Sequence, residues 1–417
     1  MITRDLVVIG GGSAGMAAAL SAHKNGIKDI LILEREKELG GILEQCIHSG
    51  FGLEYFKKEL TGPEYAELFA NDIILNNIEY KTSTTVLSVT RDKEITYSNM
   101  DEGYQTIKAK SIILATGCQE RNRGSIMLAG DRSYGVITAG LAQKYLNIMG
   151  YTVGKNVFIL GSGDIGLIMA RRMTLEGANV IGVAELMPYS NGLNRNIVQC
   201  LNDYNIPLYL STTVTNVYGK DHLERIELSK VDDNRKPIKG TEIYIDCDTL
   251  LLSVGLVPSS ELLANILVPQ SPKSKGCYVN NLLETKLEGV FSCGNCLHVH
   301  DLVDFVTKES IRAGRNASRY LKGEFKKSYN IIKLNSLNNI GYVLPNEIDL
   351  DNTIEDIVIN FRVNKPLNNK RVIIRYNEDI IYEKKKQFLL PAELEEVILS
   401  KDLLTEDMKE LVIEVLD

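Results

Sequence analysis

The sequence lacks an excess of positive charge. Its 47 lysine and arginine residues are outnumbered by 54 aspartates and glutamates, which gives a net charge of −7 at pH 7. Proteins that bind nucleic acids or anionic membranes need basic patches that face phosphate groups. We therefore expect no nucleic-acid partner, and we expect any peripheral membrane association to depend on a partner protein.

Long hydrophobic runs are also absent. The most apolar stretch, residues 6–22, is interrupted by three consecutive glycines, a serine and a further glycine, and polar residues flank it at once. A membrane-spanning helix needs about 20 consecutive apolar residues. No basic leader with a small-residue cleavage site is evident at the N-terminus. We expect a cytoplasmic protein.

Cysteine is sparse, with seven residues scattered along 417 positions. An odd number in a long chain argues against a secreted disulfide framework. The hydrophobic content of 44% and the charged content of 24% are typical of a globular protein. Because this length exceeds one ordinary hydrophobic core, we expect two or three domains.

A glycine-rich turn near the N-terminus has the pattern of a dinucleotide-binding fingerprint. An apolar strand (residues 5–9) precedes it, and a helix and a second strand (residues 30–33) follow before an acidic residue. The glycines allow a tight turn, a close approach of pyrophosphate to the backbone, and close packing of helix on strand. A plain glycine-rich turn is the alternative. The expected binding residues are Gly10, Gly12, Ser13, Ala14, Gly15, Glu34 and Arg35.

The same pattern occurs a second time. A strand over residues 156–160 leads into a second glycine-rich turn, and a helix and a strand over residues 179–183 again precede an acidic residue. The acid follows the first glycine by 24 positions in both copies, since 34 − 10 and 185 − 161 are equal. A degenerate copy that binds nothing is the alternative. The expected binding residues here are Gly161, Gly163, Asp164, Ile165, Gly166 and Glu185.

The acid of the second copy indicates which nucleotide binds there. A carboxylate at Glu185 would repel the 2′-phosphate of NADP, and the next residues, Leu186 and Met187, supply no arginine to offset it. The sequence therefore favours NAD(H) over NADP(H).

The stretch ELGGILEQCIHSGFG (residues 38–52) resembles the active-site segment of flavin disulfide reductases, but the two cysteine positions hold Leu43 and His48. Cys46 lies between them as a candidate redox thiol or charge-transfer partner, with a small packing residue as the alternative. His48 is a candidate proton relay or flavin hydrogen-bond donor, with a structural hydrogen bond as the alternative. Gly41 is expected to contact the cofactor.

Three later motifs complete a resemblance to the two-dinucleotide-domain flavoproteins of the pyridine nucleotide-disulfide-oxidoreductase type. An Ala-Thr-Gly turn follows residues 111–114, a Val-Gly-Leu-x-Pro segment follows residues 249–253, and a Gly-Val-Phe-x-x-Gly-Asn segment begins at residue 289. The resemblance implies FAD as the first nucleotide and NAD(P)H as the second. Family members usually have Asp where this chain has Asn295. The residues implied at these motifs are Ala115, Thr116, Gly117, Gly255, Gly294 and Asn295.

Within that family, the segments ATGCQER (residues 115–121) and GVITAGLAQ (residues 135–143) look like the group of sarcosine oxidase alpha chains, opine dehydrogenases and hydrogen cyanide synthases. The segments at residues 40–69 and 298–318 resemble flavoproteins that accompany glycerol-3-phosphate dehydrogenase in anaerobic bacteria. This implies an oligomer that includes a companion dehydrogenase. Larger members carry a cysteine-rich iron–sulfur module, which this chain cannot supply after Cys296, its last cysteine.

The fold expected from this resemblance is α/β, with two Rossmann-like dinucleotide-binding domains. The FAD-binding domain is expected over residues 1–118 and 280–325, and the NAD(H)-binding domain is inserted at residues 119–279. Short β-branched segments predict a small β-rich domain over residues 328–417, serving for docking or as a stabilising cap. Turns between its strands are expected at Asn360, Asn368, Asn369 and Asn377.

The helix after residue 300 is expected to face the flavin with its N-terminus, so that backbone N–H groups stabilise negative charge on the reduced ring. Asp301 is the expected N-cap, Asp304 reinforces the first turn, and Asp301 and Leu302 are candidate cofactor contacts. Cys293 and Cys296 have redox-pair spacing, but they overlap the glycine motif, so coincidence is preferred. With His298 and His300 they form a weak zinc pattern, and we expect no metal site.

Three functional hypotheses follow. The preferred hypothesis is an FAD-dependent oxidoreductase that exchanges hydride with NAD(H) and electrons with a companion dehydrogenase. The second is a stand-alone NADH oxidase or peroxidase that uses Cys46. The third is a non-catalytic nucleotide-binding protein that serves assembly.

Overall fold

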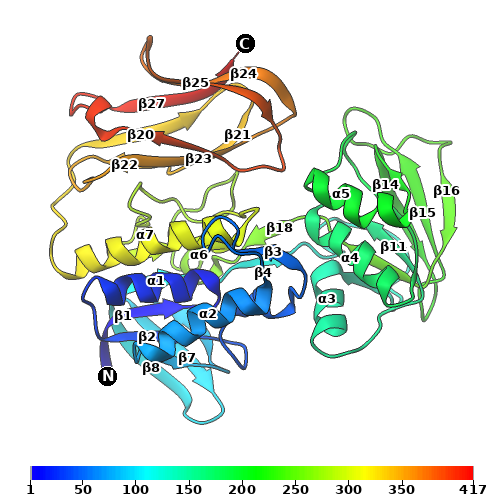
Figure 1. Ribbon diagram of the computed structural model, residues 1–417, viewed down its shortest axis with the longest axis horizontal. Coiled ribbons are helices and arrows are strands. Elements are labelled where there is room, and N and C mark those ends of the chain that lie inside the picture. The colour runs from blue at the N-terminus through cyan, green and yellow to red at the C-terminus, as the bar shows by residue number, and fades with distance from the viewer. Residues whose placement is uncertain (1, 417) are drawn as a thin grey trace. The chain divides into compact units, whose positions relative to one another are not determined.

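The computed structural model describes residues 2–416 and divides into two compact units (Figure 1). The first unit holds the chain up to Cys118 and again from Pro258 onward, and the second holds Gln119–Val257. The predicted end of the inserted domain, residue 279, lies beyond Val257. Two short strands, β9 (Cys118–Glu120) and β18 (Leu256–Pro258), carry the chain between the units and pair with each other.

A twisted sheet of seven strands forms the centre of the first unit. Its strand order is β5-β2-β1-β8-β7-β6, with β19 added beside β8. Strand β1 pairs in parallel with both β2 and β8, so the apolar run that ends at Ile9 is buried on both faces. The strands are β1 (Ile2–Ile9), β2 (Ile30–Leu33), β5 (Glu79–Lys81), β6 (Thr85–Val89), β7 (Glu94–Asn99), β8 (Gly103–Leu114) and β19 (Val290–Ser292).

Three helices lie beside one another in this unit: α1 (Ser13–Lys24), α2 (Gly62–Leu75) and α7 (Val303–Leu321). Helix α1 packs against both α7 and α2 (Figure 1). Its alanine-rich sequence allows this, because small side chains let neighbouring helices approach closely. Thr61 and Glu64 form a capping box at the start of α2. Short elements complete the region: η1 (Gly41–Gln45), β3 (Ser49–Phe51), β4 (Leu60–Thr61), α6 (Glu261–Ala264) and η3 (Gly294–Cys296).

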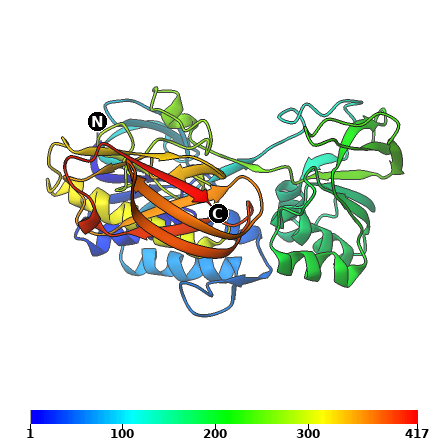
Figure 2. The ribbon, with the colours of Figure 1, turned by 90° about the horizontal axis from the view of Figure 1, so that it is seen from above.

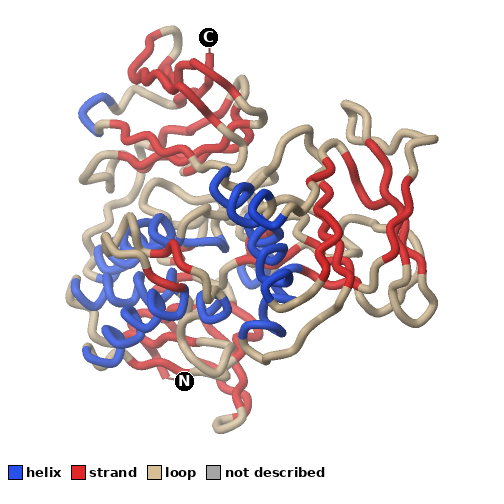
Figure 3. Tube along the Cα trace, turned by 45° about the vertical axis from the view of Figure 1, so that its right-hand side comes forward, coloured by secondary structure: helices blue, strands red, loops and turns tan. Residues whose placement is uncertain are grey.

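The second unit has its own parallel sheet, in the order β10-β17-β11-β12-β13, and a three-stranded antiparallel sheet, β14-β15-β16 (Figure 3). The apolar strand β11 lies at the centre of the parallel sheet, beside β12 and β17. The strands are β10 (Val136–Thr138), β11 (Asn156–Leu160), β12 (Asn179–Ala184), β13 (Leu208–Tyr209), β14 (Thr212–Tyr218), β15 (Arg225–Lys230), β16 (Ile243–Asp246) and β17 (Thr249–Leu252). The helical elements are α3 (Ala139–Asn147), α4 (Asp164–Leu175), α5 (Asn194–Cys200) and η2 (Asn202–Tyr204).

The C-terminal part of the first unit is built from strands (Figure 2). One sheet has the order β22-β20-β27-β24-β25 and the other β21-β23-β26, and alternating aliphatic residues form a separate core between them. We call this part the C-terminal sandwich. Its elements are β20 (Ile331–Ser336), β21 (Ile340–Leu344), β22 (Glu347–Asp349), β23 (Ile357–Val363), β24 (Leu367–Tyr376), β25 (Asp379–Leu389), β26 (Glu395–Leu399), η4 (Lys401–Leu403) and β27 (Glu410–Leu416).

The predicted fold class is confirmed: two Rossmann-like sheets and a β-rich C-terminal part occur in one α/β chain. Among residues 2–416, no helix has the length and apolar character that a membrane crossing requires.

Candidate functional site

The first glycine-rich turn is closed so tightly that its glycines cannot be replaced without displacement of backbone. Gly10 has a φ of +106°, and a Cβ there would lie 2.3 Å from the carbonyl oxygen of Ala115. A Cβ on Gly15 would lie 1.8 Å from the carbonyl oxygen of Gly10. The turn therefore fits between β8 and α1 only with glycine at both positions.

The start of α1 is open in the way that a bound phosphate requires. Gly12 is the N-cap, no side chain caps the helix, and the first turn contains no acidic residue. A Cβ on Gly12 would meet nothing nearer than 3.9 Å, so no protein atom crowds the N-cap position. Unsatisfied N–H groups and the positive end of the helix dipole attract phosphate. The turn and helix start fit the pyrophosphate of a dinucleotide.

Glu34 holds this turn from the end of β2. Its Oε2 accepts a hydrogen bond from the N–H of Gly11 at 2.5 Å, and its Oε1 accepts one from the N–H of Glu36 at 2.7 Å. The residue is buried, with 6% of its surface exposed. Each carboxylate oxygen can accept a further bond, such as one from a ribose hydroxyl. Arg35, in contrast, is an exposed side chain. We call the turn, the start of α1 and Glu34 the first cradle.

The second turn repeats this construction in the second unit. Gly161 has a φ of +101°, and a Cβ on Gly166 would lie 2.6 Å from the Gly161 carbonyl oxygen. Glu185 follows β12, and its Oε2 accepts hydrogen bonds from the N–H and the hydroxyl of Ser162 at 3.0 and 2.6 Å. Its Oε1 accepts the N–H of Met187 at 2.9 Å. We call this turn, the start of α4 and Glu185 the second cradle.

The start of α4 differs in one respect, because its first residue is acidic. Oδ1 of Asp164 accepts hydrogen bonds from the N–H of Leu193 and from Nδ2 of Asn196. Its charge is therefore turned toward α5. Gly163 is the N-cap and has no side-chain cap. Ile165 packs against the core of the second unit. The assignment of Asp164 and Ile165 to nucleotide binding stays a prediction.

Segments distant in sequence meet at the first cradle. The N–H of Gly40 donates to the carbonyl of Gly11, and Gly41 follows with a φ of +60°. A Cβ on Gly294 would lie 2.7 Å from the Cβ of Ala14, so the late glycine motif touches the first fingerprint. The structure thus gathers the stretch that begins at residue 38, the first turn and the late motif.

The Ala-Thr-Gly turn closes the same region. The N–H of Ala115 donates to the carbonyl of Ile9, and the hydroxyl of Thr116 donates to the carbonyl of Ser259. Gly117 has a φ of +71° with no heavy atom within 4 Å of an added Cβ. The corresponding Gly255, with a φ of +104°, lies in the second unit.

The two candidate catalytic side chains have ordinary environments. Cys46 is half-buried, and its thiol donates to the carbonyl of Ile42 at 3.3 Å. Burial raises the pKa of Cys46 to about 12, so the sulfur is a neutral thiol at physiological pH. The ring of His48 lies 5.1 Å from that of Phe51. Nothing in this geometry activates Cys46 as a nucleophile.

The Cys293 and Cys296 thiols do not form a disulfide; all seven cysteines are free. Burial raises the pKa of both thiols. The thiol of Cys296 approaches the carbonyls of Leu114 and Cys293, each at 3.1 Å. These contacts help to pack the segment around Gly294 and Asn295 against the end of β8.

The prediction that Asp301 is the N-cap of α7 is wrong. The helix begins at Val303 with Leu302 as N-cap, and no side chain caps it. Asp301 instead forms an ion pair with Arg362 of the C-terminal sandwich and accepts the N–H of Leu394 at 2.6 Å. A partly buried guanidinium is a stronger partner for a carboxylate than an exposed helix N–H. Leu302 takes the N-cap position that was predicted for Asp301, and its assignment to cofactor binding stays a prediction.

Asp304 has a role that local capping rules do not indicate. It is buried, and its two oxygens accept the N–H groups of Gly52 and Tyr55 at 3.2 and 2.8 Å. It thereby fastens the stretch that contains Cys46 to the start of α7.

Glu309 is a site residue that the sequence motifs did not single out. Its Oε1 accepts the N–H of Gly294 at 2.7 Å, and its Oε2 lies 2.8 Å from Nε2 of His298 and 3.5 Å from Nε2 of His300. Burial alone would raise the pKa of Glu309, but the two imidazoles hold it well below its usual range. Burial lowers the pKa of His298 to about 4. A signal was present: Glu309 lies three residues after Val306 and four before Ala313 on the buried face of α7.

Asn295 replaces the usual acid and is held by the same group of residues. Its Oδ1 accepts the backbone N–H of His300 at 3.0 Å and lies 3.3 Å from Nδ1 of that residue. Its Nδ2 faces the sulfur of Cys118 at 3.7 Å. The carbonyl end of the amide thus organises the loop before α7.

Comparison with known proteins gives a family match over most of the chain. The model of the family described as pyridine nucleotide-disulphide oxidoreductase matches residues 4–319. The chain is 26% identical to an opine oxidase subunit of Agrobacterium tumefaciens over 275 residues, which cover 62% of this chain and 53% of that protein. It is 25% identical to the HcnB subunit of hydrogen cyanide synthase from Pseudomonas protegens over 279 residues, which cover 61% and 57%. The chain spans about half the length of these curated relatives.

Solved structures share the fold. Thioredoxin reductase of T. acidophilum superposes with a TM-score of 0.61 at 24% identity, covering 78% of this chain and 99% of that one. An NAD-dependent persulfide reductase from A. fulgidus superposes with a TM-score of 0.58 at 18% identity, covering 89% and 67%.

Proposed function

Because the chain belongs to the pyridine nucleotide-disulphide oxidoreductase family, whose members bind FAD and NAD(P)H, we propose that it exchanges hydride with NAD(H) and electrons with a companion dehydrogenase. The family resemblance drawn from the sequence is confirmed, and the chain is a flavin-dependent NAD(P)H oxidoreductase. The nucleotide preference, the companion and the residue roles are the proposal. The observation that carries it is the presence of two equivalent glutamate-held cradles in one chain.

The first cradle holds FAD in this proposal. First-turn N–H groups of α1 bind its pyrophosphate, and Glu34 accepts hydrogen bonds from a ribose while it still holds Gly11. Asp304 fixes the stretch around Cys46, so that this stretch keeps a constant position beside the cofactor. Bound FAD supplies the hydride and electron chemistry, and the protein supplies position and electrostatics.

The second cradle holds NAD(H). Glu185 is buried, and both of its oxygens accept backbone N–H groups, so its charge cannot turn away from an incoming 2′-phosphate. The next two residues, Leu186 and Met187, supply no arginine to offset this charge. Binding an unpaired phosphate next to a buried carboxylate generally costs several kcal/mol of binding free energy. The geometry therefore supports NADH as the preferred nucleotide.

Electrons leave by a route other than a disulfide. Leu43 and His48 occupy the positions where disulfide reductases of this family carry their redox cysteines. The pKa of Cys46, raised to about 12 by burial, also disfavours this thiol as an electron relay or peroxide-reducing nucleophile. The relatives named above are subunits of larger enzymes, which supports a partner as the acceptor or donor. The resemblance to flavoproteins that accompany glycerol-3-phosphate dehydrogenase supports glycerol 3-phosphate as the companion's substrate.

The companion is tested by isolating the tagged full-length chain, with its bound proteins, from its own cells. The proposal expects a complex that reduces NAD⁺ anaerobically when glycerol 3-phosphate is added. A Gly163→Ala variant, expressed in the same way, serves as control and should assemble but need at least about tenfold more NAD⁺ for the same rate of reduction. A complex with turnover to a dye but none to NAD⁺ would overturn the NAD(H) link. A complex active only with another substrate would overturn glycerol 3-phosphate alone.

The stand-alone peroxidase hypothesis makes an opposite prediction. Peroxide-dependent NADH consumption by the isolated chain, abolished by Cys46→Ser, would replace the present proposal. The third hypothesis, a non-catalytic assembly protein, requires that NADH leaves bound flavin oxidised under anaerobic conditions.

A further inference from the structure

Three potential metal ligands converge in the interior of the first unit. They are Nε2 of His298, Nε2 of His300 and Oε2 of Glu309, and these atoms all lie within 4.8 Å of one another. Their side chains are 1%, 2% and 3% exposed. Two atoms that each lie 2.0–2.2 Å from a tetrahedral zinc ion are about 3.3–3.6 Å apart. The 3.5 Å between His300 and Glu309 therefore fits as it stands, and the 2.8 Å between His298 and Glu309, a hydrogen-bond distance, must widen by about 0.5 Å when an ion binds. Among the described residues 2–416, no other group of three such side chains converges in this way.

The outer atoms of these ligands are held by oxygen partners. Nδ1 of His298 lies 3.3 Å from the hydroxyl of Tyr342, and Nδ1 of His300 lies 3.3 Å from Oδ1 of Asn295. The second oxygen of Glu309 accepts the N–H of Gly294. Metal-binding histidines usually donate their other ring N–H to an oxygen, which fixes the ring and turns the free lone pair toward the ion. The ring of His300 and the carboxylate have this arrangement, and the ring of His298 has it in the tautomer whose Nδ1–H donates to the Tyr342 hydroxyl.

The hydrogen bonds of His300 require a positive charge at the point of convergence. Oδ1 of Asn295 accepts the backbone N–H of His300, which identifies this atom as the oxygen. Nδ1 of His300 must therefore donate to it, and the lone pair of Nε2 in the neutral ring faces Oε2 of Glu309 at 3.5 Å. Two acceptors facing each other in a buried site are unfavourable unless a cation lies between them. A metal ion bound by both atoms removes this conflict.

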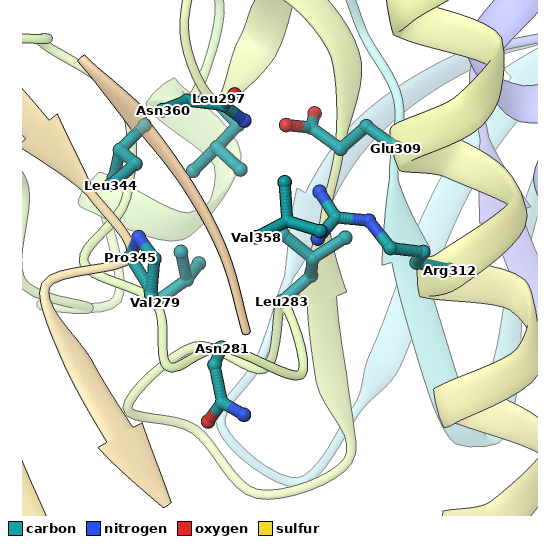
Figure 4. Close-up of a pocket in the computed structure, with 10 residues that line it drawn as sticks. All are labelled: Val279, Asn281, Leu283, Leu297, Glu309, Arg312, Leu344, Pro345, Val358 and Asn360. Atoms are coloured by element: carbon teal, nitrogen blue, oxygen red, sulfur yellow. The ribbon is translucent and has the colours of Figure 1, made fainter. Parts of the chain in front are cut away.

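The site lies where α7 meets the C-terminal sandwich. Tyr342 belongs to β21 and receives a hydrogen bond from Nε of Arg362 on β23. Beside it, Glu309 and Arg312 project from α7 into a pocket lined on the other side by Leu344, Pro345, Val358 and Asn360 (Figure 4). The charge of Arg312 is offset by Glu309, Glu355 and Glu396, and that of Arg362 by Asp301. When Glu309 binds a cation, Glu355 and Glu396 remain to balance the charge of Arg312.

We propose that His298, His300 and Glu309 bind a divalent first-row transition ion that fastens the Gly294-Asn295 turn to the C-terminal sandwich. Two imidazoles and one carboxylate suit zinc or ferrous iron better than magnesium or calcium, which prefer oxygen ligands. This site replaces the expectation of no metal, and it uses Glu309 where the weak sequence pattern had Cys293 and Cys296. It does not depend on the proposed hydride exchange.

The test measures metal directly and needs no enzymatic activity. The full-length chain is purified without a polyhistidine tag, stripped with a chelator, and titrated with Zn²⁺ against a chromophoric chelator. We expect one Zn²⁺ per chain. Co²⁺ substitution should give visible absorption bands of nitrogen and oxygen coordination. Glu309→Gln and His300→Gln should each weaken Zn²⁺ binding at least about 100-fold, and Tyr342→Phe about 10-fold, as outer-shell changes do.

The matched control is His222→Gln, which removes an exposed imidazole from the second unit and should leave Zn²⁺ binding unchanged. Circular dichroism establishes that each variant is folded, and Tyr342→Phe keeps the test informative if a ligand variant is not. No saturable Zn²⁺, Fe²⁺ or Mn²⁺ binding by the stripped chain would overturn the proposal. Undiminished binding in Glu309→Gln and His300→Gln would equally overturn it.

Discussion

The two cradles of this chain show how one local motif behaves in two surroundings. In both, a glutamate after the second strand accepts the N–H of the second residue of the turn and the N–H two positions beyond itself: Gly11 and Glu36 in the first, Ser162 and Met187 in the second. The difference lies in the helix that follows. Helix α1 has nine buried residues among its twelve, whereas α4 has five among its twelve.

That difference has a physical consequence. Helix α1 is covered by α7 and α2, so a change in the first turn must displace packed elements. Helix α4 exposes Arg171 and Leu175 and can shift at lower cost. We interpret the first cradle as suited to a resident cofactor and the second as suited to a nucleotide that binds and leaves.

The largest expected contrast comes from adding one methyl group to the last glycine of each turn. Gly15→Ala places a Cβ 1.8 Å from the Gly10 carbonyl oxygen, and Gly166→Ala places one 2.6 Å from the Gly161 carbonyl oxygen. Overpacking typically costs 1–3 kcal/mol and occasionally more, so we expect roughly 3 kcal/mol or more for Gly15→Ala and about 1–2 kcal/mol for Gly166→Ala. Differential scanning fluorimetry of the two apoproteins measures which variant loses more stability. Equal losses would contradict the contrast.

A second pair of variants separates cofactor binding from folding. Gly12 and Gly163 have φ values of −76° and −66°, and an added Cβ would meet nothing nearer than 3.9 and 3.7 Å. Both alanine variants should therefore fold normally while the methyl group occupies the space for a pyrophosphate. Gly12→Ala should lose FAD, and Gly163→Ala should keep FAD but bind NADH at least about tenfold more weakly, about 1.4 kcal/mol. Flavin absorbance per chain and NADH titration measure this. Loss of FAD in Gly163→Ala would show that the cradles are not independent.

Replacement of the two glutamates by glutamine is expected to have a smaller effect. A glutamine keeps one acceptor oxygen but directs an NH₂ group at a backbone N–H, and hydrogen bonds to charged groups contribute about 1.5–3 kcal/mol. Glu34→Gln should reduce FAD occupancy. Glu185→Gln should weaken NADH binding about tenfold, and it should weaken NADPH binding less, because the repelling charge is gone. Nucleotide affinities from equilibrium titration decide the matter, and an unchanged NADH/NADPH ratio would argue against Glu185 as the discriminating residue.

The smallest expected signal concerns the thiol beside the first cradle. Because the pKa of Cys46 is about 12, only about 10⁻⁴ of the molecules carry a thiolate at pH 8. Alkylation of Cys46 by iodoacetamide, followed by mass spectrometry of the peptide, should rise about tenfold per pH unit between pH 8 and 10. The thiol of Cys118, also half-buried, is counted separately in the same experiment. A rate that levels off below pH 9 would show a reactive thiolate and favour the peroxidase hypothesis.

The cradles could be predicted because the sequence pattern that specifies them is local. Turn, helix and acid occur within 25 residues in each copy, although the first glycine of each turn is also required by a distant strand end, at Ala115 for Gly10 and at Ser253 for Gly161. The environment of α7 could not be predicted in the same way. Asp301 pairs with Arg362, and His298 faces Tyr342, so both partners come from the C-terminal sandwich, 44 or more residues later in the chain. Local capping rules say nothing about such long-range competition.

The C-terminal sandwich shows a similar limit. Four asparagines were expected at turns, but Asn360 lies in β23, and Asn368 and Asn369 lie in β24. Only Asn377, with a φ of +54°, occupies the turn between β24 and β25. The predicted strands were correct, because the alternation of aliphatic residues follows the alternation of buried and exposed side chains along a strand. Asparagine has only a weak preference for turns, and cross-strand pairing overrides it.

The central claim is that two cradles in one chain hold FAD and NAD(H) as a working pair. The most direct test is an anaerobic titration of the purified, flavin-loaded chain with NADH and, separately, with NADPH, followed by absorbance of the flavin near 450 nm. We predict that NADH bleaches this band at far lower concentration than NADPH does, and that Gly163→Ala raises the NADH concentration needed for bleaching at least about tenfold while the flavin stays bound. A yellow protein that neither nucleotide reduces would contradict the account.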